Sequence, residues 1–225
     1  KTCPGHAVEI CVVNDPRQAL AAASALFFGA QPEVMVAVTG TNGKTTVSQW
    51  LSQALNSADE PCGVIGTLGA GLANDLTMTG FTTPDAARMQ GLLKDIQKNG
   101  AHSVTVEVSS HALDQGRVNG THFDMVVITN LSQDHLDYHG DMKEYAVAKK
   151  KILDLPGVKH VVVNADDSFG QECLQYLAKK MGDADITVWA YANKSENLLS
   201  LPCFANQSFR KILATDLQMN DQGMK

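Results

Sequence analysis

The sequence lacks the features that mark several other classes of protein. It has no run of Lys or Arg longer than the three lysines at 149–151, and its formal net charge is −6, which argues against a nucleic-acid-binding surface. No stretch approaches the roughly 18 consecutive apolar residues of a membrane helix, and no signal peptide is visible. The five cysteines are scattered, odd in number and without metal-ligand spacing, so reduced thiols in a cytoplasmic protein are expected.

The remaining composition is that of an ordinary globular protein, with 44% hydrophobic and 19% charged residues among 225. Apolar runs typical of strands alternate with patterns typical of helices. The predicted strands cover residues 9–13, 34–39, 103–108, 125–129, 160–164 and 187–191, and the predicted helices cover 17–28, 45–56, 85–98, 142–153 and 169–181. This alternation predicts an α/β fold: a mostly parallel sheet with helices on both faces, and a small antiparallel addition near the C-terminus, after Leu199.

Both ends of the chain indicate a piece of a longer protein. The sequence begins with Lys1 rather than Met. Near the other end, residues 212–219 alternate like a strand and residues 220–223 have the composition of a turn. The chain then stops two residues later, before any partner strand could form.

The strongest local pattern is a glycine-rich segment between a predicted strand and a predicted helix. It consists of Gly40, Thr41, Asn42, Gly43, Lys44, Thr45 and Thr46. Glycines let the backbone turn tightly and aim N–H groups at phosphate oxygens, and the helix N-terminus and Lys44 add positive charge. Thr45 follows the lysine, where its hydroxyl is placed to hold Mg²⁺. Val38 stands where the standard Walker A pattern requires glycine, yet nucleotide binding remains a better interpretation than a turn with an exposed lysine.

Two further predicted strands end in polar groups at the same edge of the sheet, where ligands of open parallel sheets bind. Glu107 lies near the end of one strand, and Asn130 follows the other, with Asp134 and His135 a few residues later. Glu107 fits a Mg²⁺ ligand, because hard cations prefer oxygen. His135 is less orthodox, since imidazole suits softer metals, so a structural role for it stays open.

A lysine lies on the apolar stripe of the predicted helix 142–153. At about 100° per residue, Tyr145, Ala148, Lys149 and Ile152 share one face. Lys149 either extends along the helix to the surface or is buried with an altered pKa. The pattern by itself favours the first alternative.

Five motifs combine in one order along the chain: GTNGKTT at 40–46, FTTP at 81–84, EVSSHALDQGR at 107–117, NLSQDHLDYHGD at 130–141 and YAVAKKKIL at 145–153. Together they resemble the Mur ligases, most closely the MurE type, the UDP-N-acetylmuramoyl-tripeptide synthetases. The first motif alone would also fit folylpolyglutamate synthetases. The resemblance implies that residues 1–33 end an N-terminal UDP-binding domain with its linker, that residues 34–225 are the central ATP-binding domain, and that a C-terminal domain is absent.

The resemblance also implies roles for single residues. Lys44 would contact the phosphates of ATP, Thr45 and Glu107 would serve Mg²⁺, and His135 would help to hold a second Mg²⁺. Lys149 would be carbamylated by CO₂ and become a metal-binding carboxylate. The resemblance therefore favours a buried Lys149 over one that extends to the surface. The residues implied to contact the nucleotide-peptide are Thr82, Thr83, Ser109, Gln115 and Arg117. Phe81 departs from relatives that carry a polar residue there, so a substrate contact at that position is not carried over.

The implied reaction is one step of peptidoglycan precursor synthesis. ATP would phosphorylate the D-glutamate carboxylate of UDP-MurNAc-L-Ala-D-Glu, and the amine of meso-diaminopimelate or L-lysine would attack the acyl-phosphate. The amino acid is chosen in the missing C-terminal domain, so the sequence leaves it open. Two alternatives remain: another ligase of this superfamily, either another Mur ligase or a folylpolyglutamate synthetase-like ligase, and a non-catalytic nucleotide-binding partner protein. Neither nucleic acid nor membrane is an expected partner, and a monomer is the default expectation.

Overall fold

A buried apolar strand lies at the centre of the sheet. In the computed structural model, which describes residues 12–72, 75–180, 186–201, 209–215, 219–220 and 223–224, strand β1 (Val34–Thr39) is buried at every residue after Val34. It pairs in parallel with β5 (Ser103–Glu107) on one side and with β6 (Met125–Ile128) on the other. Such continuous apolar runs are typical of strands that are covered on both faces.

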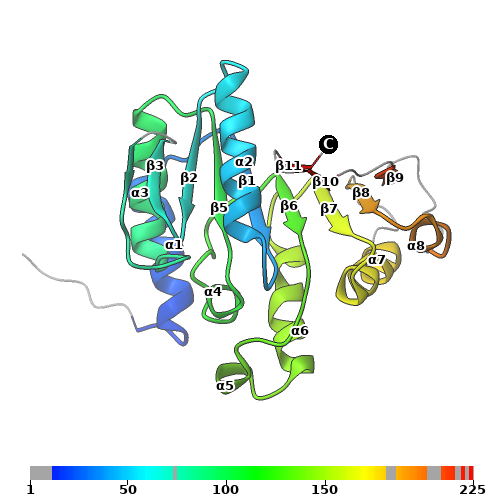
Figure 1. The fold of residues 1–225 in the computed structure, drawn as a ribbon. Helices are drawn as coiled ribbons and strands as arrows, with labels where there is room; N and C mark the ends of the chain where they lie inside the picture. Colours follow the sequence, from blue (N-terminus) through cyan, green and yellow to red (C-terminus); the bar gives the residue numbers. More distant parts are fainter. Residues whose placement is uncertain are drawn as a thin grey trace, which may run out of the picture.

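Within the described residues, nine strands make up the main sheet, in the order β4-β3-β2-β5-β1-β6-β7-β8-β9 (Figure 1). The remaining strands are β2 (Cys62–Gly66), β3 (Gly69–Leu72), β4 (Asp75–Thr77), β7 (His160–Asn164), β8 (Thr187–Ala192) and β9 (Phe209–Leu213). In the part of this order that runs from β2 through β5, β1, β6, β7 and β8 to β9, all neighbouring strands are parallel. At the β2 edge, β3 and β4 are added in antiparallel orientation. A separate antiparallel pair joins β10 (Met219–Asn220) to β11 (Gly223–Met224).

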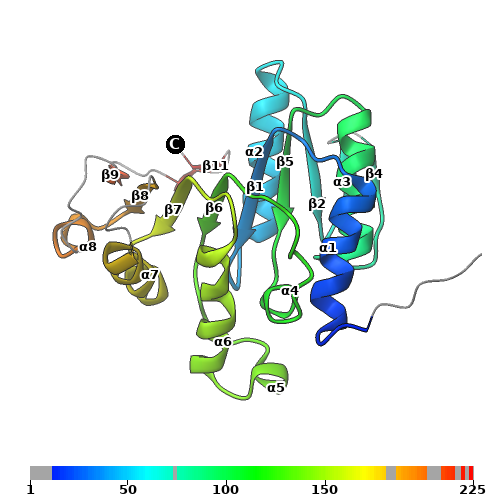
Figure 2. The ribbon, with the colours of Figure 1, turned by 180° about the vertical axis from the view of Figure 1, so that it is seen from behind.

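Helices cover both faces of the sheet, as the two opposite views show (Figures 1 and 2). Their bounds are α1 (Pro16–Phe28), α2 (Lys44–Ser57), α3 (Ala86–Lys98), α4 (Ser110–Asp114), α5 (Leu136–His139), α6 (Met142–Lys150), the 3₁₀ helix η1 (Lys151–Asp154), α7 (Ser168–Lys180) and α8 (Ser195–Leu199). Residues 36 and 38 of β1 pack toward α2, whereas residues 35 and 37 belong to the larger core with α3 and α7. Among the described residues, no helix is long and apolar enough to cross a membrane.

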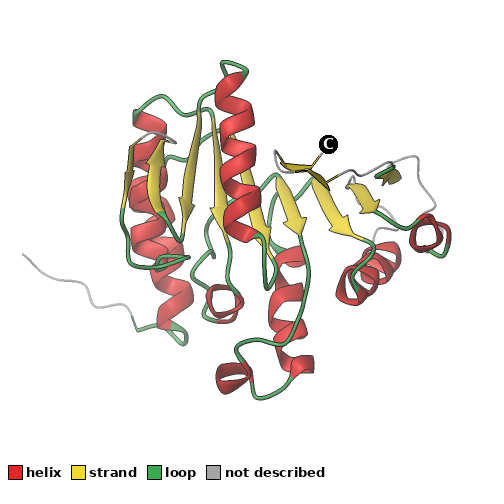
Figure 3. Cartoon of the chain, in the orientation of Figure 1, coloured by secondary structure: helices red, strands yellow, loops and turns green. Residues whose placement is uncertain are grey.

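The structure confirms the α/β class and most predicted elements (Figure 3). The predicted strands 34–39 and 160–164 have the observed bounds, and the predicted helix 142–153 divides into α6 and η1. The small antiparallel addition near the C-terminus is confirmed by β10 and β11. The expectation that no partner strand could form there was wrong, because two residues suffice for the pairing. The strand predicted over 212–219 is also wrong in its bounds, since β9 ends at Leu213.

Sequence patterns missed the edge made by β2, β3 and β4. These strands are three to five residues long, and β2 and β3 contain two glycines each. Glycine weakens both the strand propensity and the alternation on which prediction depends. The predicted strand 9–13 lies outside the described residues except for Val12 and Val13, which are not in a strand.

The parallel order brings three strand ends to one edge, the lower edge in Figure 1. The loop after β1 leads into α2, the segment after β5 leads into α4, and the segment after β6 leads toward α5. Ligands bind at this edge of open parallel sheets. Most predicted site residues come from these three connections and from the segment that precedes α3, and Lys149 comes from α6.

Candidate active site

The glycine-rich loop after β1 has a backbone that favours glycine at two positions. Gly40 has φ of +151° and Gly43 has φ of +84°, in the region that side chains rarely adopt. An added Cβ at Gly40 would lie 1.9 Å from Thr129 Oγ1. Gly40 therefore lets the loop pass directly against the end of β6.

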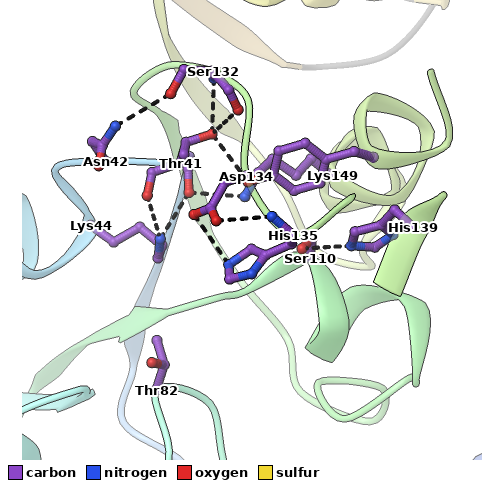
Figure 4. A network of polar contacts seen from close by, with 12 residues as sticks. Thr41, Asn42, Lys44, Thr82, Ser110, Ser132, Asp134, His135, His139 and Lys149 are labelled. Carbon is purple, nitrogen blue, oxygen red and sulfur yellow. Dashed lines mark hydrogen bonds and ion pairs between the residues drawn. The ribbon is translucent and has the colours of Figure 1, made fainter. Parts of the chain in front are cut away.

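Hydrogen bonds hold the loop against the segment that follows β6. The backbone N–H of Thr41 donates to Asn130 O at 2.9 Å, and that of Asn42 donates to Asn130 Oδ1 at 3.0 Å. The Thr41 hydroxyl lies 3.1 Å from Ser132 O (Figure 4). It also lies 3.1 Å from the hydroxyl of Tyr145 on α6. The loop is thus fixed by the segment after β6 and by α6 before any ligand binds.

The loop ends at a helix N-terminus that offers N–H groups to an anion. Helix α2 has 14 residues, and Gly43 at its N-cap provides no side-chain hydrogen bond. The first N–H groups of a helix have no partner within it, and the helix dipole favours negative charge there. Lys44 Nζ donates to Gly40 O at 2.9 Å and to Thr41 O at 3.0 Å. Burial lowers the pKa of Lys44, while Glu107 and Asp134 act in the opposite direction. The geometry fits a bound polyphosphate.

Glu107 is a fully buried carboxylate at the end of β5. It accepts hydrogen bonds from Thr45 Oγ1 at 2.8 Å, from Thr67 N at 3.1 Å and from Thr67 Oγ1 at 3.0 Å. These donors are neutral, and the ion pairs found among the described residues do not include Glu107. A buried charge is costly unless a partner of opposite sign compensates it. The pair of Thr45 and Glu107 therefore fits a divalent cation with oxygen ligands.

Lys149 is buried, with 1% of its surface exposed, so it does not extend to the surface. Its Nζ donates to Gly40 O at 2.9 Å and lies 4.9 Å from the centre of the Tyr145 ring. Burial, and then the neighbouring charge of Lys44, lowers the pKa of Lys149 to about 7. Two lysines thus converge on one carbonyl oxygen of the loop, and one of them is readily neutral near physiological pH.

His135 belongs to a cluster of rings beside Lys149. It has a left-handed backbone with φ of +53°, and its Nε2 lies 3.4 Å from Asp134 Oδ2. The ring centres of His111 and Tyr145 lie 4.9 Å and 6.1 Å from that of His135. Burial, followed by the charges of His135 and His139, lowers the pKa of His111. His135 itself is 43% exposed on its side chain, so it remains open to a ligand.

The predicted metal residues form two pairs. Thr45 and Glu107 are in direct contact, whereas His135 and Lys149 both border the ring of Tyr145. In the described ranges, no group of three or more His, Cys, Asp and Glu side chains could hold a metal ion. The first pair already offers oxygen ligands. The second gains a further oxygen from Asp134, which the sequence patterns did not assign.

The residues predicted to contact the nucleotide-peptide are linked to one another. The Thr83 hydroxyl donates to Glu107 O at 2.7 Å and accepts from Ser109 N at 3.0 Å, so it is used within the protein. Arg117 Nη1 donates to Thr83 O at 2.9 Å, and two of its other nitrogens donate to Gln115 Oε1. The structure therefore gathers these residues at one place, with the Arg117 guanidinium held in a defined orientation.

The remaining predicted contact, Thr82, connects this group to the buried carboxylate. Its hydroxyl lies 3.0 Å from Thr67 Oγ1, which in turn donates to Glu107. Figure 4 shows Thr82 beyond Lys44, on the side away from Lys149. Thr67 was missed because it lies in the short turn between β2 and β3, where no strand was predicted.

Tyr138 is a second residue that sequence reasoning missed. Its hydroxyl donates to Asp114 Oδ2 at 3.1 Å and accepts from Gln115 Nε2 at 3.1 Å, and its ring centre lies 4.1 Å from that of His111. Tyr138 thereby joins the ring cluster to the segment of Gln115 and Arg117. The only sequence signal was its position in the motif that contains His135.

Comparisons with known proteins identify the family of this domain. The family model for the Mur ligase middle domain matches residues 38–224. A UDP-N-acetylmuramoyl-L-alanyl-D-glutamate–2,6-diaminopimelate ligase from Ralstonia nicotianae is 53% identical over 143 residues, which are 64% of this chain and 28% of that protein. A solved structure of a ligase with the same name has a TM-score of 0.74 at 30% identity, over 96% of this chain and 44% of that one. The chain thus spans less than half the length of these relatives.

A folylpolyglutamate synthase from Mycobacterium tuberculosis, complexed with ADP, is a more distant structural neighbour. Its TM-score is 0.59 at 17% identity, over 79% of this chain and 47% of that one. Identity this low shows a shared fold and no more.

Proposed function

Since the chain belongs to the Mur ligase family through its middle domain, we propose that the full-length protein is an ATP-dependent ligase that adds a diamino acid to UDP-MurNAc-L-Ala-D-Glu. The observation that carries the proposal is the convergence of a phosphate loop, the buried Glu107 and the buried Lys149 at one sheet edge. Relatives named as diaminopimelate ligases support the substrate class.

In this proposal, the loop of residues 40–46 and the N-terminus of α2 bind the phosphates of ATP. Lys44 exchanges its two carbonyl partners for phosphate oxygens, because a charge-assisted hydrogen bond is stronger than one to a neutral carbonyl. The hydrogen bonds of Thr41 and Asn42 to the segment after β6 keep the loop rigid during this exchange. Preorganised donors of this kind need no reorganisation as charge develops.

Magnesium fits the residues present, and Thr45 with Glu107 would hold it. A second site would use His135 and a carbamylated Lys149. When bound, Mg²⁺ neutralises phosphate charge and so lowers the repulsion between two anionic reactants. The remaining steps concern the protein's own groups.

The substrate carboxylate is proposed to attack the γ-phosphorus of ATP, with ADP leaving as the bond between the β- and γ-phosphates breaks. Lys44 stabilises the charge that develops on the transferred group. The amine of the diamino acid then attacks the acyl carbon, phosphate leaves, and the amine loses a proton as the amide forms. Thr82, Ser109, Gln115 and Arg117 orient the nucleotide-peptide so that its carboxylate faces the loop.

Carbamylation of Lys149 follows from its environment. A neutral amine attacks CO₂, loses a proton and becomes a carbamate, and a pKa of about 7 makes the neutral amine abundant at physiological pH. The product carries negative charge beside Lys44, where the protonated form of Lys149 would add a second positive charge. We therefore propose the carbamate as the functional form.

In the proposed full-length protein, two further domains flank this one. Residues 1–33 would close an N-terminal UDP-binding domain, and a C-terminal domain would select the amino acid. Helix α1 of that linker packs on α3, with Ala21 and Ser24 buried. The substrates are nucleotide-linked and the reaction consumes ATP, so the proposed enzyme works in the cytoplasm.

A ligation assay on the full-length protein tests the proposal. The reaction contains UDP-MurNAc-L-Ala-D-Glu and MgATP, with meso-diaminopimelate or L-lysine supplied separately. We expect ADP release that requires the nucleotide-peptide and one of the two amino acids, with diaminopimelate favoured by the relatives' names. ATP binding without turnover on either amino acid would contradict the proposal and favour a folate-type ligase or a non-catalytic partner.

A further inference from the structure

A cavity beside the predicted substrate residues includes a helix that no motif singled out. It has a volume of about 300 Å³ and lies between the start of α1, the start of α3 and the turn after α4. Its lining includes Arg17, Leu20, Phe81, Asp85, Gln115 and Arg117. Three segments that are far apart in sequence therefore enclose one space, and α1 contributes a cation to it.

The position of Arg17 is fixed by the local structure of α1. Asp15 caps the helix, and its Oδ1 accepts from Arg17 N at 2.9 Å and from Gln18 N at 3.2 Å. One and two turns further on, Ala21 and Ser24 are buried at 1% and 5% exposure. Helix α1 is thus anchored to the domain, and the backbone of Arg17 stays at the rim of the cavity.

The cavity carries unsatisfied positive charge. The hydrogen bonds of Arg117 occupy three of the five N–H groups that a guanidinium offers. The Arg17 side chain is exposed and has no hydrogen bond or ion pair with the described residues. The single carboxylate of the lining, Asp85, caps α3 through Arg88 N at 3.0 Å. An anionic ligand would balance this excess of cations.

The same cavity also has an apolar part in its lining. Leu20 and Phe81 are about half exposed, at 49% and 51%. The ring of Phe81 can contact a methyl group. The cavity therefore suits a ligand with a carboxylate or phosphate next to a small apolar group.

We infer that Arg17 is a substrate-binding residue that, with Arg117, holds an anionic group of the nucleotide-peptide while Leu20 and Phe81 contact an adjoining methyl group. The identity of this ligand rests on the proposed function. UDP-MurNAc-L-Ala-D-Glu offers both chemistries, since its anions are the diphosphate and the glutamate carboxylates, and its alanyl unit carries a methyl group. Arginine binds either anion through paired hydrogen bonds.

The test compares Arg17→Ala and Arg17→Lys with the unchanged full-length protein. Isothermal titration with UDP-MurNAc-L-Ala-D-Glu is expected to show a Kd at least about 10-fold higher for Arg17→Ala, the loss typical of a charge-assisted hydrogen bond. Arg17→Lys keeps the positive charge but loses the planar guanidinium, so its Kd should lie between those of the unchanged protein and Arg17→Ala. The KM for ATP and the kcat at saturating nucleotide-peptide should stay within about twofold, because Arg17 lies outside the phosphate loop.

Arg88→Ala is the matched control, because Arg88 is an exposed arginine of the neighbouring helix that does not line the cavity. Competition experiments with UDP and with MurNAc-L-Ala-D-Glu identify the anion that Arg17 binds. If Arg17→Ala weakens the binding of UDP, the anion is the diphosphate. If it weakens the binding of MurNAc-L-Ala-D-Glu, the anion is a carboxylate. Equal Kd values for Arg17→Ala, Arg88→Ala and the unchanged protein would overturn the inference. Failure of the unchanged protein to bind the nucleotide-peptide would instead contradict the proposed function.

Discussion

Replacing Lys44 with alanine is expected to lower kcat/KM for ATP by about 10³-fold, comparable with the loss of a preorganised group that stabilises a transition state. Lys44 is the cation inside the loop, where its Nζ lies 2.9 Å from Gly40 O. Two anionic reactants must meet beside it, and the variant leaves their repulsion unscreened by the protein. Steady-state ligation kinetics on the full-length protein measure the effect.

Lys98→Ala provides the control for this experiment. Lys98 ends α3, away from the loop, and is exposed. We expect this variant to retain kcat/KM within about twofold, as is usual for surface substitutions away from a site. A Lys44→Ala enzyme that is as active as Lys98→Ala would exclude the proposed role of the loop lysine.

Replacing Lys149 with alanine is expected to reduce kcat by about 10²- to 10³-fold, because the site loses the carboxylate that carbamylation creates. Lys149→Glu places a carboxylate on a shorter side chain and should retain more activity than Lys149→Ala. A structural role alone predicts the reverse, since a glutamate would bring an unpaired acid into a buried position.

The modification itself is measurable by ¹³C nuclear magnetic resonance in ¹³C-bicarbonate. The unchanged protein should show a carbamate signal that Lys149→Ala lacks. Because the reacting amine must be neutral and its pKa is about 7, the signal should be strong near pH 8 and decline as the pH falls below 7. A spectrum without a signal that depends on Lys149 would contradict carbamylation.

The pH dependence of the free energy of unfolding tests the burial of Lys149 independently. In the absence of CO₂, the pKa of Lys149 is about 7 in the folded protein and 10.5 for an ordinary lysine. Between these values the unfolded chain binds the additional proton, so the free energy of unfolding should rise with pH from about 7 to 10.5. Below pH 7 Lys149 is protonated in both states, so the destabilisation by the buried cation reaches its full value. Lys149→Met should weaken this rise.

The central part of the fold could be predicted because its signals are local. The buried strand β1 is continuously apolar, and the stripe of Tyr145, Ala148 and Ile152 places Lys149 on the inner side of its helix. The choice between a buried and a surface lysine could not be made from the pattern, because a lysine side chain can extend along a helix. The structure decides it through the contact with Gly40 O.

The residues that were missed depend on contacts over long sequence separations. Thr67 meets Glu107 across 40 residues, and Tyr138 meets Gln115 across 23. Neither contact leaves a periodic trace in the sequence, because both residues lie outside long regular elements. The antiparallel edge that carries Thr67 was likewise hidden by its glycines. A sequence motif can identify the segment to which such residues belong. The residues that they contact can be identified only from the folded structure.

The transfer of a labelled oxygen tests the central claim most directly. The glutamate carboxylate of UDP-MurNAc-L-Ala-D-Glu is labelled with ¹⁸O, and the phosphate released by the full-length protein during ligation is analysed by mass spectrometry. An acyl-phosphate mechanism predicts one labelled oxygen in each phosphate, since the oxygen that attacks the γ-phosphorus leaves with it. Phosphate without label, in a reaction that still forms the amide, would contradict the mechanism proposed for this site.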